Sequence, residues 1–356
     1  MSILFSPLQL KSVELANRIA VSPMCMYSAI DGFSNDWHMV HLGSRAVGGA
    51  GLVISEATAV SPEGRISPDD LGIWKDEHVE NLKRITSFIE KQGAVPGIQL
   101  AHAGRKASIS SEWKGNGAFL SPAEGGWEIV APSAIPFSSA TGTPHELSKE
   151  EIKTIITKFG SAVRRALDAG FKVVEIHASH GYLIHEFLSP LSNHRQDEYG
   201  GSFANRVRFL LEIIDAVKQV WNHEYPLFVR ISATDWAEEG GWDLAQSIKL
   251  CSLLKEKGVD LIDVSTGGLI PHVKIPIDYG YQLSFARQIK REVGIAVGTV
   301  GMITNAVQAE TILQSRDADI IFMGRQLLRD PYFPLRAAKE LNDEISWPVQ
   351  YRRAKF

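Results

Sequence analysis

Eight short apolar runs recur along the chain, and each is followed by a longer segment with helical periodicity. The runs are rich in β-branched residues and lack the strict alternation that marks a half-exposed strand. Unbroken apolar runs suit parallel strands covered on both faces. The runs span 18–22, 51–55, 95–100, 172–176, 226–231, 259–264, 294–298 and 318–323. This repetition constrains the fold most, because eight strand–helix units are what an α/β barrel of the (β/α)8 type requires.

The segments between the runs carry helix signals. Ser148, followed by Glu151, forms a capping box that predicts a helix from 149 to about 169, and Gly170 is placed to end it. Further helices are predicted over 78–91, 205–221, 244–257, 281–292 and 305–314. No composition shift or linker divides the chain. We therefore predict one (β/α)8 TIM barrel over residues 1–356, with a C-terminal tail from about residue 342.

The main alternative is a doubly wound open sheet. Such a sheet commonly shows G-x-G-x-x-G after its first strand, whereas this chain has SPMCMY at 22–27. One segment does not follow the barrel pattern, because residues 107–147, after the third run, show little periodicity. Long irregular segments in compact domains are usually functional. We expect this excursion to form a lid over the barrel mouth.

Charge and cysteine content exclude several kinds of partner. The net charge of −4 and pI of about 6.3 provide no basic field for nucleic acid or an anionic membrane. No apolar run approaches the ~18 residues that a membrane helix needs. Two cysteines, Cys25 and Cys251, suit a reducing compartment. We expect a soluble, cytoplasmic protein that acts on small molecules.

Chemistry-bearing residues follow most of the runs, at the barrel end where active sites gather. In chain order they are Ser22, Pro23, Met24, Cys25, Glu56, Ala57, Gln99, His102, His177, His180, Tyr182, Arg230 and the glycine-rich stretches 265–268, 298–301 and 323–325. An unpaired buried charge is costly, so Arg230 must face a partner. That partner is either a barrel carboxylate or a bound planar ring with carbonyl groups, which Gln99 would help to hold.

The glycine-rich ends of the last two runs are a candidate phosphate site. Glycine lets backbone N–H groups approach phosphate oxygens closely, and Arg325 would add a bidentate positive charge. The alternative is that these glycines simply end their strands, but their place in the barrel favours phosphate.

Two histidines three residues apart admit several interpretations. His177 and His180 could bind a metal, as in a metal-dependent barrel lyase or hydrolase, but no third ligand has a clear spacing and no H-E-x-x-H motif is present. They could be core histidines, or paired donors to one substrate oxygen, with Tyr182 as a proton source. A Schiff-base lysine is disfavoured, because Lys172 begins its strand and Lys106 falls in the long loop.

Five longer stretches carry a family resemblance. They are PMCMYSA (23–29), EATAVSPEGRIS (56–67), IQLAHAGRKAS (98–108), EIHASHGYLIHEFLSPLSNHRQDEYGGSFANR (175–206) and FMGRQLLRDP (322–331). Together they resemble the Old Yellow Enzyme family of flavin-dependent ene-reductases, and within it the thermophilic-like branch of bacterial NADPH dehydrogenases and xenobiotic reductases. The resemblance implies non-covalent FMN, reduction by NADPH, and reoxidation by electron-poor alkenes, quinones or nitro compounds.

The resemblance also implies roles for single residues toward the cofactor. The residues that would line the flavin are Ser22, Pro23, Met24, Cys25 and Ala57. Gln99 and Arg230 would meet the polar edge of its ring system, and the phosphate would be bound by Gly301, Gly324 and Arg325. Cys25, a weak hydrogen-bond donor beside the flavin, could shift its reduction potential or act only as a small buried hydrophobe.

The resemblance also implies roles for the residues that would contact the substrate. His177 and His180 would bind the activating oxygen, hydride would pass from flavin N5 to the β-carbon, and Tyr182 would protonate the α-carbon. Tyr27 would help to close the pocket. Arg353, in the basic tail, would reach the neighbouring active site of a homodimer or homotetramer, although a basic tail is by default a solvated one.

Overall fold

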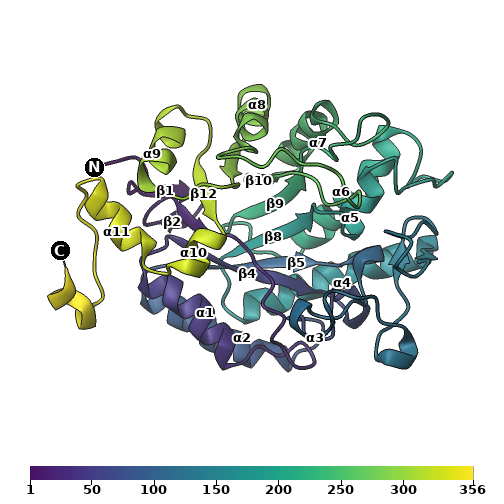
Figure 1. The fold of residues 1–356 in the computed structure, drawn as a ribbon, viewed down its shortest axis with the longest axis horizontal. Coiled ribbons are helices and arrows are strands. Elements are labelled where there is room, and N and C mark those ends of the chain that lie inside the picture. The colour runs from purple at the N-terminus through teal and green to yellow at the C-terminus, as the bar shows by residue number, and fades with distance from the viewer. Residues whose placement is uncertain (356) are drawn as a thin grey trace.

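Within residues 1–355, which the computed structural model describes, eight parallel strands close into a barrel (Figure 1). They are β3 (Ile19–Val21), β4 (Leu52–Ala59), β5 (Val95–Ala101), β8 (Val173–Ala178), β9 (Leu227–Ser232), β10 (Leu261–Ser265), β11 (Ala296–Thr299) and β12 (Ile320–Met323). Neighbours in this order pair in parallel, and β12 pairs with β3 to close the ring. Each predicted run coincides with one strand, so the (β/α)8 prediction is confirmed.

Helices surround the barrel. The main ones are α1 (Asp36–Val47), α2 (His78–Lys91), α4 (Lys149–Asp168), α6 (Phe203–Lys218), α7 (Leu244–Glu256), α8 (Leu283–Val293), α9 (Ala306–Gln314) and α11 (Phe333–Glu340). The capping box of Ser148 and Glu151 is present at the start of α4. Helix α1 was not predicted. Its apolar residues Trp37 and Val40 are exposed, so the hydrophobic residues of this segment do not follow a clear helical period.

An N-terminal hairpin, which the sequence did not predict, closes the bottom of the barrel. Its strands are β1 (Leu8–Leu10) and β2 (Val13–Leu15). Leu10 and Leu15 pack into one cluster with Val173, Phe228 and Leu261, which lie in the first two residues of their strands. This apolar plug leaves the opposite end, where the strands finish, for polar side chains.

The excursion after β5 packs against the barrel mouth. It contains α3 (Glu112–Gly115), η3 (Pro122–Glu124), β6 (Val130–Ala131) and β7 (His145–Glu146). Ala107 and Ile129 form a small apolar cluster, against which Tyr27 and Tyr182 pack. The predicted excursion therefore lies beside two of the predicted site residues.

The C-terminal tail runs beside α11 at the left edge of Figure 1. It ends in the short helix η4 (Val349–Ala354), where the Tyr351 ring lies 6.0 Å from that of Tyr332. Arg353 is exposed there. None of the helices within the described residues combines the length and hydrophobicity needed to cross a bilayer.

Candidate active site

Four polar side chains form a layer across the barrel, above the apolar plug. Gln99, Glu175, Arg230 and Asp263 come from four neighbouring strands and are almost fully buried. Gln99 Nε2 donates to Glu175 Oε1 at 2.7 Å. Arg230 Nε lies 3.3 Å from Asp263 Oδ2, and Arg230 Nη1 donates to Ser22 Oγ at 3.1 Å. Arg230 therefore has a barrel carboxylate as partner, one of the two options that the sequence left open.

The layer holds two carboxyl groups but one cation. Burial and the neighbouring Asp263 raise the pKa of Glu175 to about 8, against the opposing effects of Arg230 and Gln99. Burial also raises the pKa of Asp263, and Arg230 opposes that shift. Since Arg230 contacts Asp263 directly, we assign the negative charge to Asp263 and a proton to Glu175 at neutral pH. The layer is then electrically balanced.

Three aromatic rings cluster at the end of β8. His177 is the last residue but one of the strand. Its ring centroid lies 5.3 Å from that of His180 and 4.9 Å from that of Tyr182, and both of these rings are nearly perpendicular to it. His177 Nδ1 lies 3.0 Å from Ser179 Oγ, which directs Nε2 away from this contact. His180 Nε2 lies 2.7 Å from Ser265 Oγ. The structure therefore brings the three predicted residues together.

The environment keeps all three rings uncharged at neutral pH. Burial, with the positive charge of Arg230, holds the pKa values of His177 and His180 well below the usual histidine range. Burial also raises the pKa of Tyr182 well above its usual range. Neutral imidazoles donate one hydrogen bond each, and a protonated phenol can give up its proton. The cluster is thus a set of neutral donors.

The end of β3 forms the opposite wall. Ser22 is buried, and the segment 23–27 is partly exposed. Its backbone is held by Glu56 within β4, because Glu56 Oε2 accepts from Met26 N at 3.0 Å. Burial, followed by the charges of Asp70 and Glu56, raises the pKa of Cys25 well above its usual range, so Cys25 is a neutral thiol. Ala57 pairs with Gln99 in the sheet.

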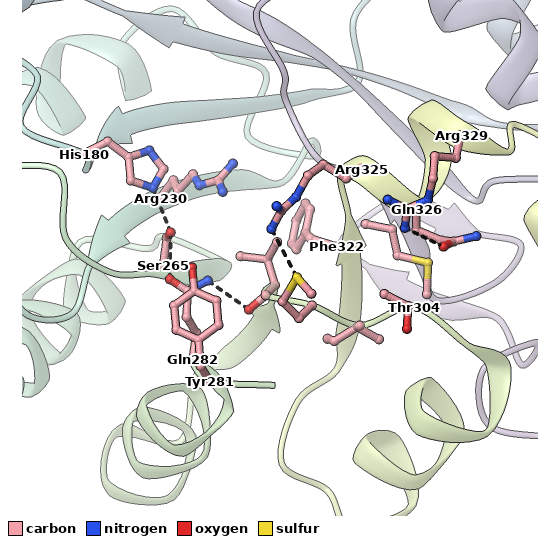
Figure 2. A pocket seen from close by; sticks show the side chains of 16 residues that line it. His180, Arg230, Ser265, Tyr281, Gln282, Thr304, Phe322, Arg325, Gln326 and Arg329 are labelled. Atoms are coloured by element: carbon pink, nitrogen blue, oxygen red, sulfur yellow. Dashed lines mark hydrogen bonds between the residues drawn. The ribbon is translucent and has the colours of Figure 1, made fainter. Parts of the chain in front are cut away.

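A cavity of about 280 Å³ opens at the ends of β11 and β12 (Figure 2). Arg230, Gly301, Gly324 and Arg325 line it. A Cβ atom at Gly301, where φ is +122°, would lie 2.9 Å from the Tyr281 ring, so the wall requires glycine there.

Arg325 stands at the rim of this cavity as a cation without an acidic partner. Its Nη2 contacts the sulfur of Met302 at 3.2 Å, and among residues 1–355 it forms no ion pair. A guanidinium beside a glycine-rich strand end suits a phosphate group. Farther in, Arg230 carries more N–H donors than its contacts to Asp263 and Ser22 use. These residues fit a phosphate-bearing cofactor with an electron-rich ring.

Sequence reasoning missed several groups around the site. Lys106 was placed out in the loop, but it lies in the short helix η2 (Gly104–Lys106), and its Nζ is 5.1 Å from the Tyr182 ring centroid. That placement was wrong because the loop folds back over the mouth. Burial lowers the pKa of Lys106 to about 8. Glu175 and Asp263 were missed because both lie inside strands that read as apolar runs.

No group of three or more His, Cys, Asp or Glu residues within the described part of the chain is placed to hold a metal ion. His177 Nδ1 and His180 Nε2 each lie beside a serine hydroxyl. Arg353 is not among the residues that line the cavity, and its predicted reach into a neighbouring subunit stays a prediction.

The barrel, its polar layer and its phosphate-compatible rim suit a flavin-dependent oxidoreductase, and the family comparison shows this class. Residues 3–344 match the model of the FMN oxidoreductase family described as the NADH:flavin oxidoreductase / NADH oxidase family. The chain belongs to this family. It is therefore an enzyme whose cofactor is FMN, and the predicted resemblance to Old Yellow Enzymes is confirmed.

Individual proteins are similar to this chain over almost its whole length. The NADPH dehydrogenase of Bacillus subtilis (strain 168) is 53% identical over 352 residues, which cover 98% of each chain. Among solved structures, morphinone reductase superposes with a TM-score of 0.81 at 29% identity, covering 98% of this chain and 91% of that one. The 2-naphthoyl-CoA reductase structure gives a TM-score of 0.86 at 26% identity, with 95% of this chain covering 52% of the other.

Proposed function

We propose that the protein is an NADPH dehydrogenase of the ene-reductase type, which reduces the activated C=C bond of α,β-unsaturated carbonyl or nitro compounds. The observation that carries the proposal is the cluster of His177, His180 and Tyr182, three uncharged donors at the strand ends of an FMN-binding barrel. NADPH as reductant is supported by the names of relatives about half identical to this chain. A matched structure of morphinone reductase was solved with tetrahydroNAD.

Toward the cofactor, we assign the wall at the end of β3 to the flavin ring. The proposed lining residues are Ser22, Pro23, Met24, Cys25 and Ala57. Gln99 and Arg230 would bind the polar edge of the ring, where the positive charge of Arg230 favours electron-rich forms. Gly301, Gly324 and Arg325 would bind the phosphate.

Toward the substrate, the neutral histidines act as donors. When bound, FMN supplies the hydride, taken from NADPH, that reaches the β-carbon of the substrate. His177 and His180 donate hydrogen bonds to the carbonyl or nitro oxygen and stabilise the negative charge that develops there. Tyr182 gives its proton to the α-carbon, and its raised pKa keeps that proton in place until the carbanion forms. The alkene gains one hydride and one proton, and the Tyr182 phenolate then takes a proton from solvent, so electrons and protons balance.

Two further assignments belong to this proposal. Tyr27, whose ring packs edge-on at 5.8 Å against exposed Trp113, closes the substrate side of the pocket. Arg353 completes the site of a neighbouring subunit in a homodimer or homotetramer. Quinones and other electron-poor small molecules that present an oxygen to the histidine pair belong to the same substrate class.

Replacing Tyr182 by phenylalanine tests the proposal. Without its phenol proton, reoxidation of the reduced enzyme by cyclohexenone should slow by about 10²-fold or more, because general acid catalysis contributes ~10²–10⁴-fold. FMN reduction by NADPH should stay within about threefold. Stopped-flow absorbance of the flavin measures both steps. The matched control is Tyr225→Phe at the closed end of the barrel, and equal losses in both steps of Y182F would contradict a dedicated proton donor.

A further inference from the structure

The turn that carries His180 and Tyr182 has an unfavourable backbone. His180 has φ +58° and Gly181 has φ +73°, two consecutive residues in the left-handed region. Non-glycine residues adopt that region rarely, and it persists only where the surroundings hold it. Gly181 is required, because a Cβ atom there would lie 2.3 Å from Gly268 O. The turn therefore depends on its neighbours for its shape.

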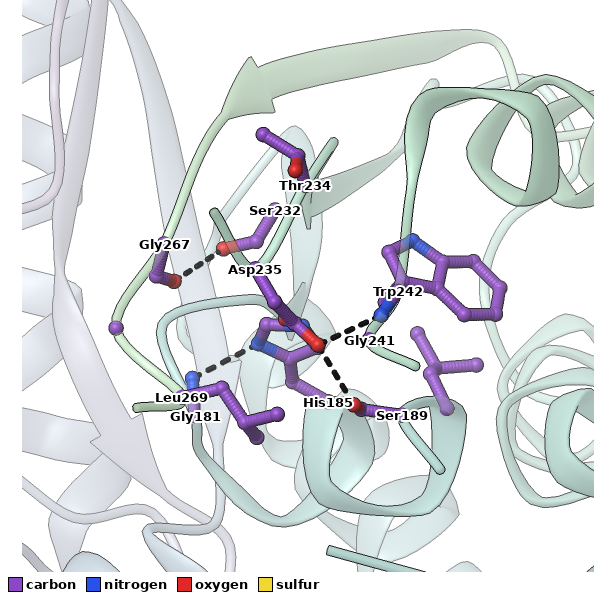
Figure 3. A network of polar contacts seen from close by, with 12 residues as sticks. Gly181, His185, Ser189, Ser232, Thr234, Asp235, Gly241, Trp242, Gly267 and Leu269 are labelled. Carbon is purple, nitrogen blue, oxygen red and sulfur yellow. Dashed lines mark hydrogen bonds and ion pairs between the residues drawn. The ribbon is translucent and has the colours of Figure 1, made fainter. Parts of the chain in front are cut away.

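Three side chains from separate elements bind the polar backbone groups of this turn. Ser232, which ends β9, accepts from His180 N at 2.9 Å. Lys106 Nζ donates to His180 O at 2.9 Å. His185, in the helix α5 (Leu183–Leu188), accepts from Gly181 N through Nδ1 at 2.9 Å (Figure 3). The third contact lies deepest, since His185 is fully buried.

His185 is the third residue of α5, and its side chain reaches back beyond the start of the helix. Tyr182, the N-cap of α5, makes no capping hydrogen bond with its side chain, and His185 accepts from Gly181 N, one residue before the N-cap. Because Nδ1 accepts from Gly181 N–H, the ring proton lies on Nε2. That nitrogen is 2.9 Å from Asp235 Oδ1. The geometry thus selects one tautomer of His185.

Asp235 is anchored in its turn. Its Oδ2 accepts from Ser189 Oγ at 2.6 Å and from Trp242 N at 2.8 Å, as Figure 3 shows. Burial raises the pKa of Asp235, but His185, Ser189 and the Trp242 N–H outweigh it and hold the pKa below its usual range. Asp235 is therefore an ionised carboxylate beside His185 Nε2, and its negative charge favours a proton on that nitrogen.

This Ser, His and Asp grouping is not a hydrolytic triad. Ser189 Oγ donates to Asp235 and not to His185, and Ser189, His185 and Asp235 are all fully buried. A nucleophile needs the base beside it and access to substrate. The network faces the turn, so its function must be sought there.

We propose that His185, oriented by Asp235, is a positioning residue for the active site: by binding Gly181 N–H it fixes the turn that places His180 and Tyr182 against the substrate. This inference rests on the proposed ene-reductase function. A displacement of about 1 Å in a reacting group can cost ~10²-fold in rate. Loss of the His185 acceptor should therefore affect substrate binding and reoxidation but not the chemistry of FMN reduction.

The test compares two replacements of His185 in the FMN-loaded enzyme. His185→Leu removes the acceptor, whereas His185→Gln keeps one, since the side-chain oxygen of glutamine can accept a hydrogen bond from a backbone N–H. For H185L we expect reoxidation by cyclohexenone to slow ~10–100-fold and the Kd of a phenol, read from the flavin absorbance, to rise similarly. FMN reduction by NADPH should change less than about threefold, and H185Q should recover most of both losses.

A second buried histidine provides the matched control. His78 in α2 bonds the backbone oxygen of Asp31 at 3.0 Å, apart from the turn, and His78→Leu should leave reoxidation and phenol affinity within about threefold. The proposal is overturned if H185L matches the wild type, or if H185Q falls as far as H185L. If H185L does not fold, H185Q and Asp235→Asn are each compared with the wild type instead. Reoxidation rate and phenol affinity should fall in Asp235→Asn but not in H185Q.

An NMR measurement separates this inference from the proposed function. In ¹⁵N-histidine-labelled holoenzyme, the His185 ring should show an unprotonated Nδ1 and a protonated Nε2 at neutral pH, and in D235N that selection should weaken. This result does not depend on any substrate. A protonated Nδ1 would overturn the positioning role, whereas the expected tautomer in an enzyme that cyclohexenone fails to reoxidise would overturn only the proposed function.

Discussion

The double variant His177→Ala, His180→Ala should lose about 10²–10³-fold or more in the rate at which cyclohexenone reoxidises the reduced flavin, because removal of one such donor typically costs that much. Both rings are uncharged and close to each other, with centroids 5.3 Å apart. Phenol-type ligands should bind correspondingly more weakly. Stopped-flow reoxidation and absorbance titration measure the two effects.

A histidine at the surface provides the control for this prediction. His223 is exposed at the surface, with 90% of its side chain accessible, and His223→Ala should leave both measurements unchanged. FMN should still bind in the double variant, because the proposed flavin and phosphate contacts lie on other strands and His180 is the only altered residue that lines the cavity. Reoxidation at the wild-type rate in the double variant would remove the role assigned to the histidine pair.

Replacing Arg230 by methionine should damage both stability and cofactor binding. The change leaves Asp263 buried without its cation, and breaking a buried pair in this way costs about 3–5 kcal/mol of unfolding free energy. FMN affinity should fall as well, because the proposed flavin-edge donor is lost. Urea unfolding and FMN titration by fluorescence measure the two losses separately.

The Arg230→Met deficit should depend on pH with a definite sign. Without Arg230, the folded-state pKa of Asp263 rises further above its unfolded value, so the folded state binds the extra proton. Stability is then retained at acidic pH and lost as pH rises through the folded pKa. The deficit relative to the wild type should be smaller near pH 5 than near pH 8. A deficit that is constant or larger at acidic pH would contradict the charge assignment.

A second substitution separates the two effects of Arg230. Adding Asp263→Asn to Arg230→Met removes the unpaired charge, so part of the stability should return. FMN affinity should not return, because the donor to the ring is still missing. Recovery of both quantities would show that Arg230 serves the barrel alone, as the salt-bridge interpretation of the sequence allowed.

The sequence predicted the barrel well because each strand is a contiguous run. Burial on both faces makes such runs continuous in hydrophobicity, and residues such as His177 and Arg230 stand out at their ends. The same property hid Glu175 and Asp263, whose side chains point into the barrel from within the runs. A carboxylate inside an apolar strand near a buried arginine is a signal that could have found them.

Other parts of the site could not be predicted from local sequence patterns, because they depend on contacts between segments far apart in the chain. The contact of Lys106 with the His180 backbone joins residues far apart in the sequence, through a loop without periodicity. The pairing of His185 with Asp235 likewise depends on how α5 packs against the loop after β9. The family resemblance predicted the residues that would contact the cofactor and the substrate. The residues that hold these in place, such as Lys106 and His185, were found only in the structure.

An anaerobic single-turnover experiment tests whether the protein is an ene-reductase. The holoenzyme is reduced with one equivalent of NADPH, then mixed with cyclohexenone while flavin absorbance and products are followed. We predict that the oxidised flavin spectrum returns and that cyclohexanone forms in a one-to-one ratio with NADPH consumed. A flavin that NADPH reduces but that stays reduced until oxygen is admitted, with no cyclohexanone formed, would contradict the assignment as an ene-reductase.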